Sequence, residues 1–213
     1  MRARDDWYRK QTWSAADAAE FDRRLSRSRG QRTQYIKLQA WHLAQTKKPR
    51  LADAAILLAK RYLAEDPNGF FEVEAHLIIA EAKTTLRDFP GALHAYRSAV
   101  KAETRKRGLR CCAYLAYAWF AASNGLFEEF DDVLKSMESM QEADLLFPIS
   151  QYKYFGALAL ISAERQDCEN ARRMARNALE AETKSAPFTR HKDVGIVSGI
   201  DSVTQKRIRQ LAA

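Results

Sequence analysis

Histidines and cysteines are the side chains of this chain best suited to metal binding or nucleophilic catalysis. The four histidines occur singly, and none lies in an HExxH motif or at metal-ligand spacing from a cysteine or carboxylate. Cys111 and Cys112 are adjacent in a helical pattern, Cys168 is distant, and an odd number cannot all pair, which indicates reduced thiols. We therefore expect no enzyme, no metal and no cofactor. The histidines are His42, His76, His94 and His191.

An arginine-rich stretch, RRLSRSRGQR, is the second feature with chemical potential. Its guanidinium groups suit contacts to phosphates, and the nearby Tyr35 suits stacking on a base. Arginines in the last turn of a helix also interact favourably with the helix dipole, without any ligand. Binding of nucleic acid (RNA or DNA) is therefore an alternative function. Its residues would be Arg23, Arg24, Arg27, Arg29 and Arg32.

The net charge of +8 is concentrated at the N-terminus. Residues 1–50 hold 13 Lys and Arg against 5 Asp and Glu, whereas residues 51–213 hold 22 of each kind. The stretch FEEFDDVLKSMESMQEAD is acidic, and the chain becomes basic again from Lys184. Such asymmetry favours steering of a partner or docking of the ends on the middle, and it does not specify a fold.

The composition is typical of a globular helical protein. Hydrophobic residues make up 46% of the 213 residues, and 5 Pro and 8 Gly are too few to interrupt many helices. The longest apolar run, AYLAYAWFAA, is about half the roughly 20 residues that a transmembrane helix needs. The N-terminus has no apolar stretch typical of a secretory signal. We expect a cytoplasmic protein that does not bind membranes.

A repeated spacing of small residues organises most of the chain. A helix over about 70–87 and a second over about 89–103, with Pro90 in its first turn, form a hairpin in which Ala80, Ala92, Tyr96 and Ala99 face inward. The same offsets recur in two other stretches, and a looser copy with a two-residue slip starts at Ala116 and has Phe130 at the small-residue position. The matching sets are Ala40, Ala52, Ile56 and Ala59, and Ala159, Ala171, Ala175 and Ala178.

This pattern resembles the tetratricopeptide (TPR) family, whose units place small residues where two helices cross closely. The periods of 40, 36 and 43 residues exceed that family's 34, and its Trp, Gly and Tyr consensus is mostly missing. The resemblance implies an all-α, right-handed stack of antiparallel helix pairs. The predicted parts are a basic segment and capping helix (1–31), about four hairpins (32–184), and an extended strap with a short basic helix (185–213). An unrelated helical bundle with Ala-rich contacts is the alternative.

The resemblance also implies a non-catalytic module that binds a protein or peptide on its concave face, as an adaptor, a regulator or an immunity-type protein. The first helix of each unit lines that face, and Trp41, Arg110 and Tyr117 are the leading candidates because Trp, Tyr and Arg often dominate interface energetics. Trp41 stands where chaperone-binding relatives have Asn, so that partner class is not expected. The predicted partner-binding residues are Gln34, Lys37, Trp41, Gln45, Glu74, Leu77, Glu81, Arg110, Tyr117, Phe120 and Lys153.

Both ends of the array carry local signals. Ser14 followed by Asp17 predicts the start of a helix that ends near Gly30. Beyond the array, Pro187 and Gly195 break the helical pattern, and Phe188 and Ile196 are expected to pack on the last hairpin near Tyr154 and Leu158. A terminal helix, capped by Asp201 or Ser202, is expected to remain free to meet a partner. Its predicted apolar side comprises Ile200, Val203, Ile208 and Leu211.

Overall fold

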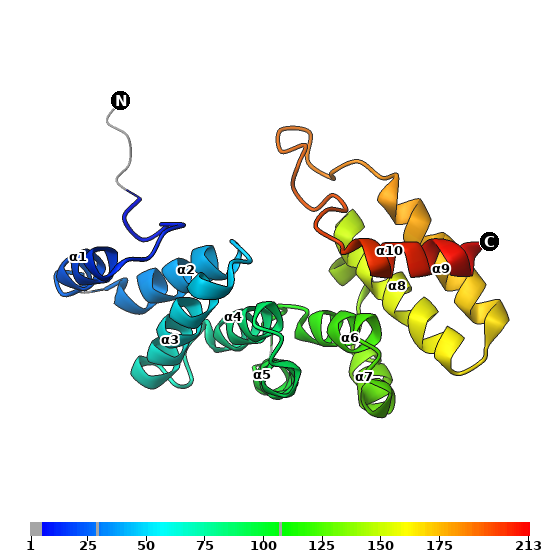
Figure 1. Cartoon of the computed structure of the whole chain (residues 1–213), viewed down its shortest axis with the longest axis horizontal. Helices are drawn as coiled ribbons and strands as arrows, with labels where there is room; N and C mark the ends of the chain where they lie inside the picture. Colours follow the sequence, from blue (N-terminus) through cyan, green and yellow to red (C-terminus); the bar gives the residue numbers. More distant parts are fainter. Residues whose placement is uncertain (1–5, 29, 107) are drawn as a thin grey trace. The chain divides into compact units, whose positions relative to one another are not determined.

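The computed structural model describes residues 6–28, 30–106 and 108–213, and the secondary structure of these residues is entirely helical (Figure 1). The all-α class predicted from composition is therefore confirmed. The α-helices are α1 (Ala15–Leu25), α2 (Arg32–Ala44), α3 (Pro49–Glu65), α4 (Glu72–Thr85), α5 (Phe89–Arg105), α6 (Ala113–Ser123), α7 (Phe130–Met137), α8 (Pro148–Glu164), α9 (Cys168–Glu182) and α10 (Ser202–Ala212). Two short 3₁₀ helices are η1 (Phe127–Glu129) and η2 (Glu142–Leu145).

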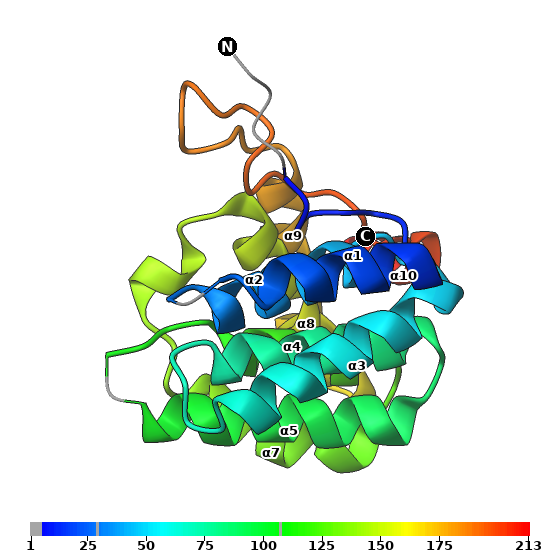
Figure 2. The same cartoon turned by 90° about the vertical axis from the view of Figure 1, so that its left-hand side faces the viewer.

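The chain divides into two compact units. Unit 1 ends at Ala113 and contains α1 to α5, and unit 2 (Tyr114–Ala213) contains the later helices. In unit 1, α2 packs on α3, α3 on α4 and α4 on α5, and α2 also contacts α4 (Figure 2). In unit 2, α8 packs on α9, and α10 packs on both.

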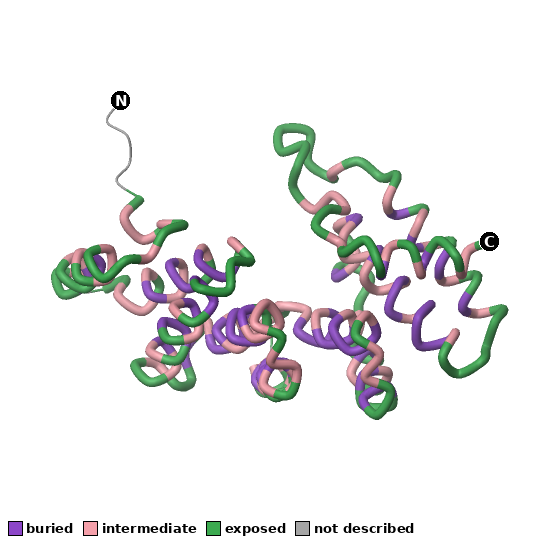
Figure 3. The backbone as a smooth tube through the Cα atoms, in the orientation of Figure 1, coloured by how far each residue is buried: buried purple, intermediate pink, exposed green. Residues whose placement is uncertain are grey.

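The predicted alanines lie at the helix contacts. Ala40 on α2 and Ala52 on α3 are buried, as are Ala80 on α4 and Ala92 on α5, and the helices of each pair pack on one another. Figure 3 shows buried stretches along these helices. Ala159 and Ala171 are likewise buried in the α8–α9 pair. A methyl side chain at these positions lets two backbones approach closely, which explains the recurring spacing.

The turn between the paired helices also recurs. In each of the turns after α2, α4, α6 and α8, one residue has a positive φ. This residue lies two positions before the first residue of the next helix. In three of the turns, the next amide closes the end of the preceding helix: Asp88 N donates to Lys83 O at 3.0 Å, and Asp167 N to Ser162 O at 2.9 Å. Leu126 N donates to Ala121 O at 3.0 Å. The positive-φ residues are Lys47, Arg87, Gly125 and Gln166.

These turns share the register of the sequence repeat. Ala40, Ala80 and Ala159 each stand seven residues before the positive-φ residue of their unit, and Ala116 stands nine before Gly125. The two-residue slip in the looser unit therefore lies before its turn, within α6, because α6 ends two residues before Gly125 just as α4 ends two residues before Arg87. Prolines open three helices, since Pro49, Pro90 and Pro148 lie in first turns, where a missing N–H costs no bond.

At the N-terminal end, Ser14 and Asp17 form the predicted capping box: Ser14 Oγ accepts from Asp17 N at 3.1 Å, and Asp17 Oδ2 accepts from Ser14 N at 2.9 Å. The helix is shorter than predicted, because α1 ends at Leu25 rather than near Gly30. Ser26 and Arg27 form a turn, and Gly30 and Gln31 form a bend just before α2 begins at Arg32.

At the C-terminal end, α10 begins after Asp201, whose side chain accepts from Thr204 N at 2.8 Å, as predicted. The prediction that this helix is free is wrong, because α10 packs on α9 and α8 and Ile208 is 0% exposed. Val203, predicted to share one apolar side with Ile208, is 69% exposed. The helix therefore packs around Ile208 and Thr204.

The segment between α9 and α10 contains turns and bends, so the predicted break in the helix is present. Its predicted packing near Tyr154 and Leu158 is not seen: Phe188 remains 45% exposed and its ring lies 5.9 Å from that of Phe147. Ile149 N donates to Gly195 O at 2.9 Å. The segment is therefore anchored at the start of α8.

Candidate partner-binding face

Four of the predicted partner-binding residues lie on one side of α2. Gln34, Lys37, Trp41 and Gln45 follow one another at intervals of three or four residues, which places them along one face of a helix. Gln34, Trp41 and Gln45 are exposed and Lys37 is half-buried. The opposite side of α2 carries the buried Ile36, Ala40 and Leu43.

The corresponding side of α4 adjoins this row. Glu74, Leu77 and Glu81 follow the same helical spacing, and α2 contacts α4. Gln45 Nε2 donates a hydrogen bond to Glu81 Oε2 at 3.0 Å, which joins the two helices directly. The structure therefore brings together the predicted residues of the first two units. We call Gln34, Lys37, Trp41, Gln45, Glu74, Leu77 and Glu81 the α2–α4 face.

Trp41 is the largest exposed side chain of the α2–α4 face. It is 44% exposed, and its ring lies edge-on to His42 at 4.8 Å between centroids. Partial burial and the nearby Arg9 lower the pKa of His42, so that the imidazole is neutral at pH 7. The indole therefore offers an apolar surface and an N–H donor beside an uncharged ring.

Lys37 is held in place by an aromatic ring. Its Nζ lies 4.2 Å from the centroid of Phe71, a distance at which the ring attracts the cation. The Phe71 N–H donates to the Tyr62 hydroxyl at 2.9 Å, which fixes the residue at the start of α4. Lys37 is thus a positioned cation at one end of the face.

Glu74 supplies negative charge further along α4. Its Oε2 atom is buried and has no hydrogen-bond partner among the residues that the structure describes. Partial burial, together with the nearby carboxylates of Glu74 and Glu103, raises the pKa of the Cys111 thiol to about 12. Cys111 therefore stays a neutral thiol at physiological pH and is a poor nucleophile.

The remaining predicted residues do not join this face. Arg110 lies in the loop after α5 rather than on a helix, so its predicted place is wrong. Tyr117 and Phe120 are buried in unit 2, at 3% and 2% exposure, and Tyr117 Oη donates to Glu129 Oε2 at 2.5 Å. Aromatic residues on α6 thus serve packing rather than an exposed surface. Lys153 is half-buried on α8.

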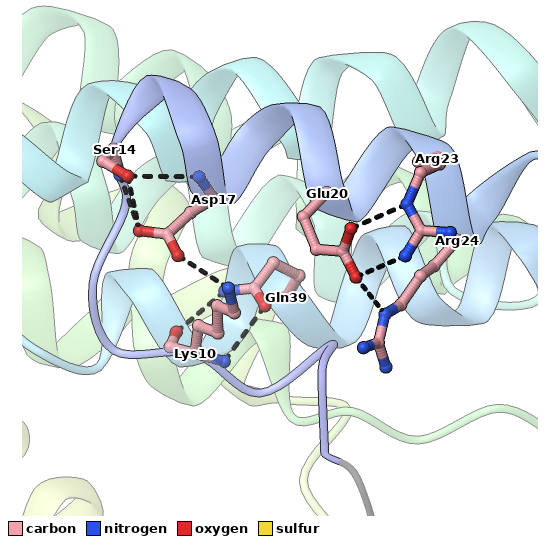
Figure 4. A network of polar contacts seen from close by, with 7 residues as sticks. All are labelled: Lys10, Ser14, Asp17, Glu20, Arg23, Arg24 and Gln39. Atoms are coloured by element: carbon pink, nitrogen blue, oxygen red, sulfur yellow. Dashed lines mark hydrogen bonds and ion pairs between the residues drawn. The ribbon is translucent and has the colours of Figure 1, made fainter.

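The arginines of the nucleic-acid alternative are largely paired with carboxylates. Glu20 accepts hydrogen bonds from Arg23 and Arg24, and these bonds lower the pKa of Glu20 to about 2 (Figure 4). Arg32 binds Glu65 through two hydrogen bonds of 2.7 and 3.0 Å. Arg27 is exposed, and Arg29 lies outside the described residues. The positive electrostatic field around the end of α1 is therefore weaker than the number of arginines in the sequence suggests.

Sequence reasoning missed the segment that covers α1 and α2. Lys10 N donates to Gln39 Oε1 at 3.1 Å and Gln39 Nε2 donates back to Lys10 O at 2.8 Å, which satisfies a glutamine that is 0% exposed (Figure 4). The ring centroid of Trp7 lies 5.3 Å from that of Phe21 and 5.1 Å from that of Tyr35. Tyr35, proposed above for base stacking, is thus engaged in a ring cluster. In the sequence, only the aromatic residues among residues 7–13 indicated that this segment packs on the helices.

Within the described part of the chain, no three His, Cys, Asp or Glu side chains are grouped as a metal site would require. Among the same residues, no helix combines the length and apolar character needed to cross a bilayer. No protein-family model, curated protein or solved structure matched the chain. The functional argument therefore depends on the geometry of its own surfaces.

Proposed function

We propose that this protein is a non-catalytic interaction module that binds a segment of a partner protein on the α2–α4 face. In this proposal its helix pairs form a right-handed, TPR-like stack, and the protein acts in the cytoplasm as an adaptor, a regulator or an immunity-type protein. The recurring turn at Lys47, Arg87 and Gln166, in the register of the buried alanines, supports equivalent repeats.

One observation carries the functional proposal. Trp41 is 44% exposed on a row whose neighbour, Gln45, is hydrogen-bonded to Glu81 on the next helix. A large aromatic side chain on a rigid surface loses little conformational entropy when a partner covers it. Such residues therefore often dominate the binding free energy. Lys37 and Glu81 supply charges of opposite sign on the same face, as the recognition of one orientation requires.

The test compares two variants in a pull-down from native lysate with identification by mass spectrometry. Trp41→Ala removes the exposed indole, and Leu57→Ala removes an apolar side chain on α3 that is 69% exposed but lies outside the face. We expect a stoichiometric partner with the wild type and with Leu57→Ala, and its loss with Trp41→Ala. An interface tryptophan at the centre of binding contributes about 2 kcal/mol or more, about 30-fold in Kd.

Two results would refute the proposal. The first is a partner retained equally by Trp41→Ala and the wild type, because the α2–α4 face would then not be the binding surface. The second is turnover of a metabolite by the pure protein without a stoichiometric partner.

Nucleic acid remains the alternative ligand, although the pairing of Arg23, Arg24 and Arg32 with carboxylates counts against it. Binding through phosphate contacts would weaken steeply with rising salt, because bound counterions are released. Affinity for a mixed-sequence oligonucleotide that falls with salt and is lost in an Arg24→Ala and Arg27→Ala double variant would favour this alternative.

A further inference from the structure

Unit 2 contains a surface cavity that no predicted site residue lines. Its volume is about 590 Å³, and its walls come from η2, the start of α8 and the residue Lys184 after α9. Leu145, Leu146 and Phe155 supply its apolar surface. A volume of this size, with apolar walls and a few polar groups at the rim, is typical of a site for a small ligand or a few residues of a peptide.

Exposed apolar side chains gather at this end of α8. Leu146 is 54% exposed, and Phe188 and Val194 of the following segment are each 45% exposed. The Phe147–Phe188 ring contact at 5.9 Å and the hydrogen bond from Ile149 N to Gly195 O keep that segment beside the start of α8. Apolar surface that is left in water by rigid elements indicates a contact surface.

The rim of the cavity carries a cation that is held in position. Lys184 Nζ donates to Gln151 Oε1 at 2.9 Å, and Gln151 Nε2 donates to the Leu145 carbonyl at 2.7 Å. Lys184 also forms an ion pair with Glu180 at 3.2 Å, but the Glu180 side chain is 67% exposed, and such a pair exchanges readily for another carboxylate. An ammonium has three donors, so Lys184 retains one for a ligand.

Charges on the cavity lining and on the segment anchored at the start of α8 determine which ligand is favoured. Arg190 and Lys192 are exposed on the anchored segment between Phe188 and Gly195, together with the acidic Asp193, so this loop carries a net positive charge. Glu142 also lines the cavity, and its carboxylate repels an acidic group of a ligand on that side. A bound segment is thus oriented, with its acidic group towards Lys184.

We propose that this cavity docks an acidic protein segment that places one bulky apolar side chain against Leu146 and Phe155 and a carboxylate on Lys184. The site lies in unit 2 and does not depend on the α2–α4 face. The Trp41→Ala variant should therefore still bind the acidic segment at this cavity, whatever its effect on the proposed partner of the α2–α4 face. The apolar side chain supplies most of the affinity through desolvation, and the ion pair supplies orientation and selectivity.

The test is an NMR titration of the full-length protein with three blocked heptapeptides. The first is Gly-Ser-Leu-Glu-Glu-Ser-Gly, the second has Lys in place of both Glu, and the third has Ala in place of Leu. We expect the first to shift the amide signals of Leu146, Gln151 and Phe155, and the other two to bind at least about tenfold more weakly.

Two exposed positions allow the site to be altered without unfolding the protein. Leu146→Ala should weaken the acidic peptide about tenfold, and Lys184→Glu should make the basic peptide the better ligand. The matched controls are Leu57→Ala and Lys60→Glu, both at exposed positions of α3, which should leave all affinities unchanged. Equal binding of the three peptides, or no saturable shift with the acidic peptide at millimolar concentration, would overturn the proposal.

Discussion

The two ends of the chain are closed by different kinds of contact. In unit 1 a non-helical segment, residues 6–13, covers α1 and α2, where Trp7 packs on Phe21 and Lys10 exchanges two hydrogen bonds with Gln39. In unit 2 a helix, α10, covers α8 and α9. Both covers keep apolar side chains out of water, since Phe21 is 2% exposed and Ile208 is 0% exposed.

The difference lies in how each cover is held. At the C-terminal end the contact is steric: a Cβ on Gly156 would lie 3.0 Å from both the Ile208 Cδ1 and the Trp119 ring, so glycine makes the space that these side chains fill. At the N-terminal end the contact includes a buried amide that must be paired. Mutations should therefore act through packing at the C-terminal end and through polar pairing at the N-terminal end.

The largest effect is expected from Ile208→Ala. Ile208 is 0% exposed, so truncation leaves a cavity above Gly156 and should lower the free energy of unfolding by about 2–5 kcal/mol. Urea denaturation followed by circular dichroism measures the change. Val203→Ala on the same helix, 69% exposed, is the control and should change it by less than about 0.5 kcal/mol. Equal effects of the two substitutions would contradict the packing of α10.

A smaller effect is expected from Gln39→Leu. The substitution leaves the N–H and C=O of Lys10 without their partners, which costs about 1–3 kcal/mol if the segment stays bound. Release of the segment into water limits this cost and should change the fluorescence of Trp7. Gln34→Leu, at an exposed position of α2, should have little effect. Unaltered fluorescence and stability in Gln39→Leu would show that the paired amide does not hold the segment.

The recurring turn can be altered in both directions within unit 2. Gly125 has φ of 65° and only ordinary contacts around its position, so Gly125→Ala should cost about 1 kcal/mol through backbone strain. Gln166 has φ of 62° with a side chain, and Gln166→Gly should stabilise the protein by up to about 1 kcal/mol. Thermal unfolding measures both. The same sign for both substitutions would contradict the equivalence of the turns.

The smallest effect is a dependence on pH at the N-terminal end. A hydrogen bond from Lys10, followed by those from Ser14, lowers the pKa of Asp17 from 3.8 to about 2. Because the folded-state pKa is lowered, the stabilisation is present above pH 3.8 and is lost as the pH falls towards about 2. The difference in urea midpoint between wild type and Asp17→Asn should therefore shrink over this range. For Asp53→Asn, an exposed control on α3, no such trend is expected.

Several features of the fold could be predicted from the sequence because they depend on neighbours within one helical turn. The capping box of Ser14 and Asp17 and the cap at Asp201 link residues three positions apart. The alanine spacing follows from the helical period, so it predicted the buried positions of paired helices. It also identified the α2–α4 face, since residues at intervals of three or four share one side of a helix.

Other features depend on which distant segments meet, and helical period alone leaves that open. Arg32 pairs with Glu65, 33 residues away, and Gln39 with the Lys10 backbone, 29 residues away. Phe120 is buried although its spacing suited an exposed face, and Ile208 is buried although the terminal helix was expected to be free. Local hydrogen bonds and helical period thus determined the elements, whereas the tertiary packing of side chains decided which charges are neutralised and which apolar surfaces stay open.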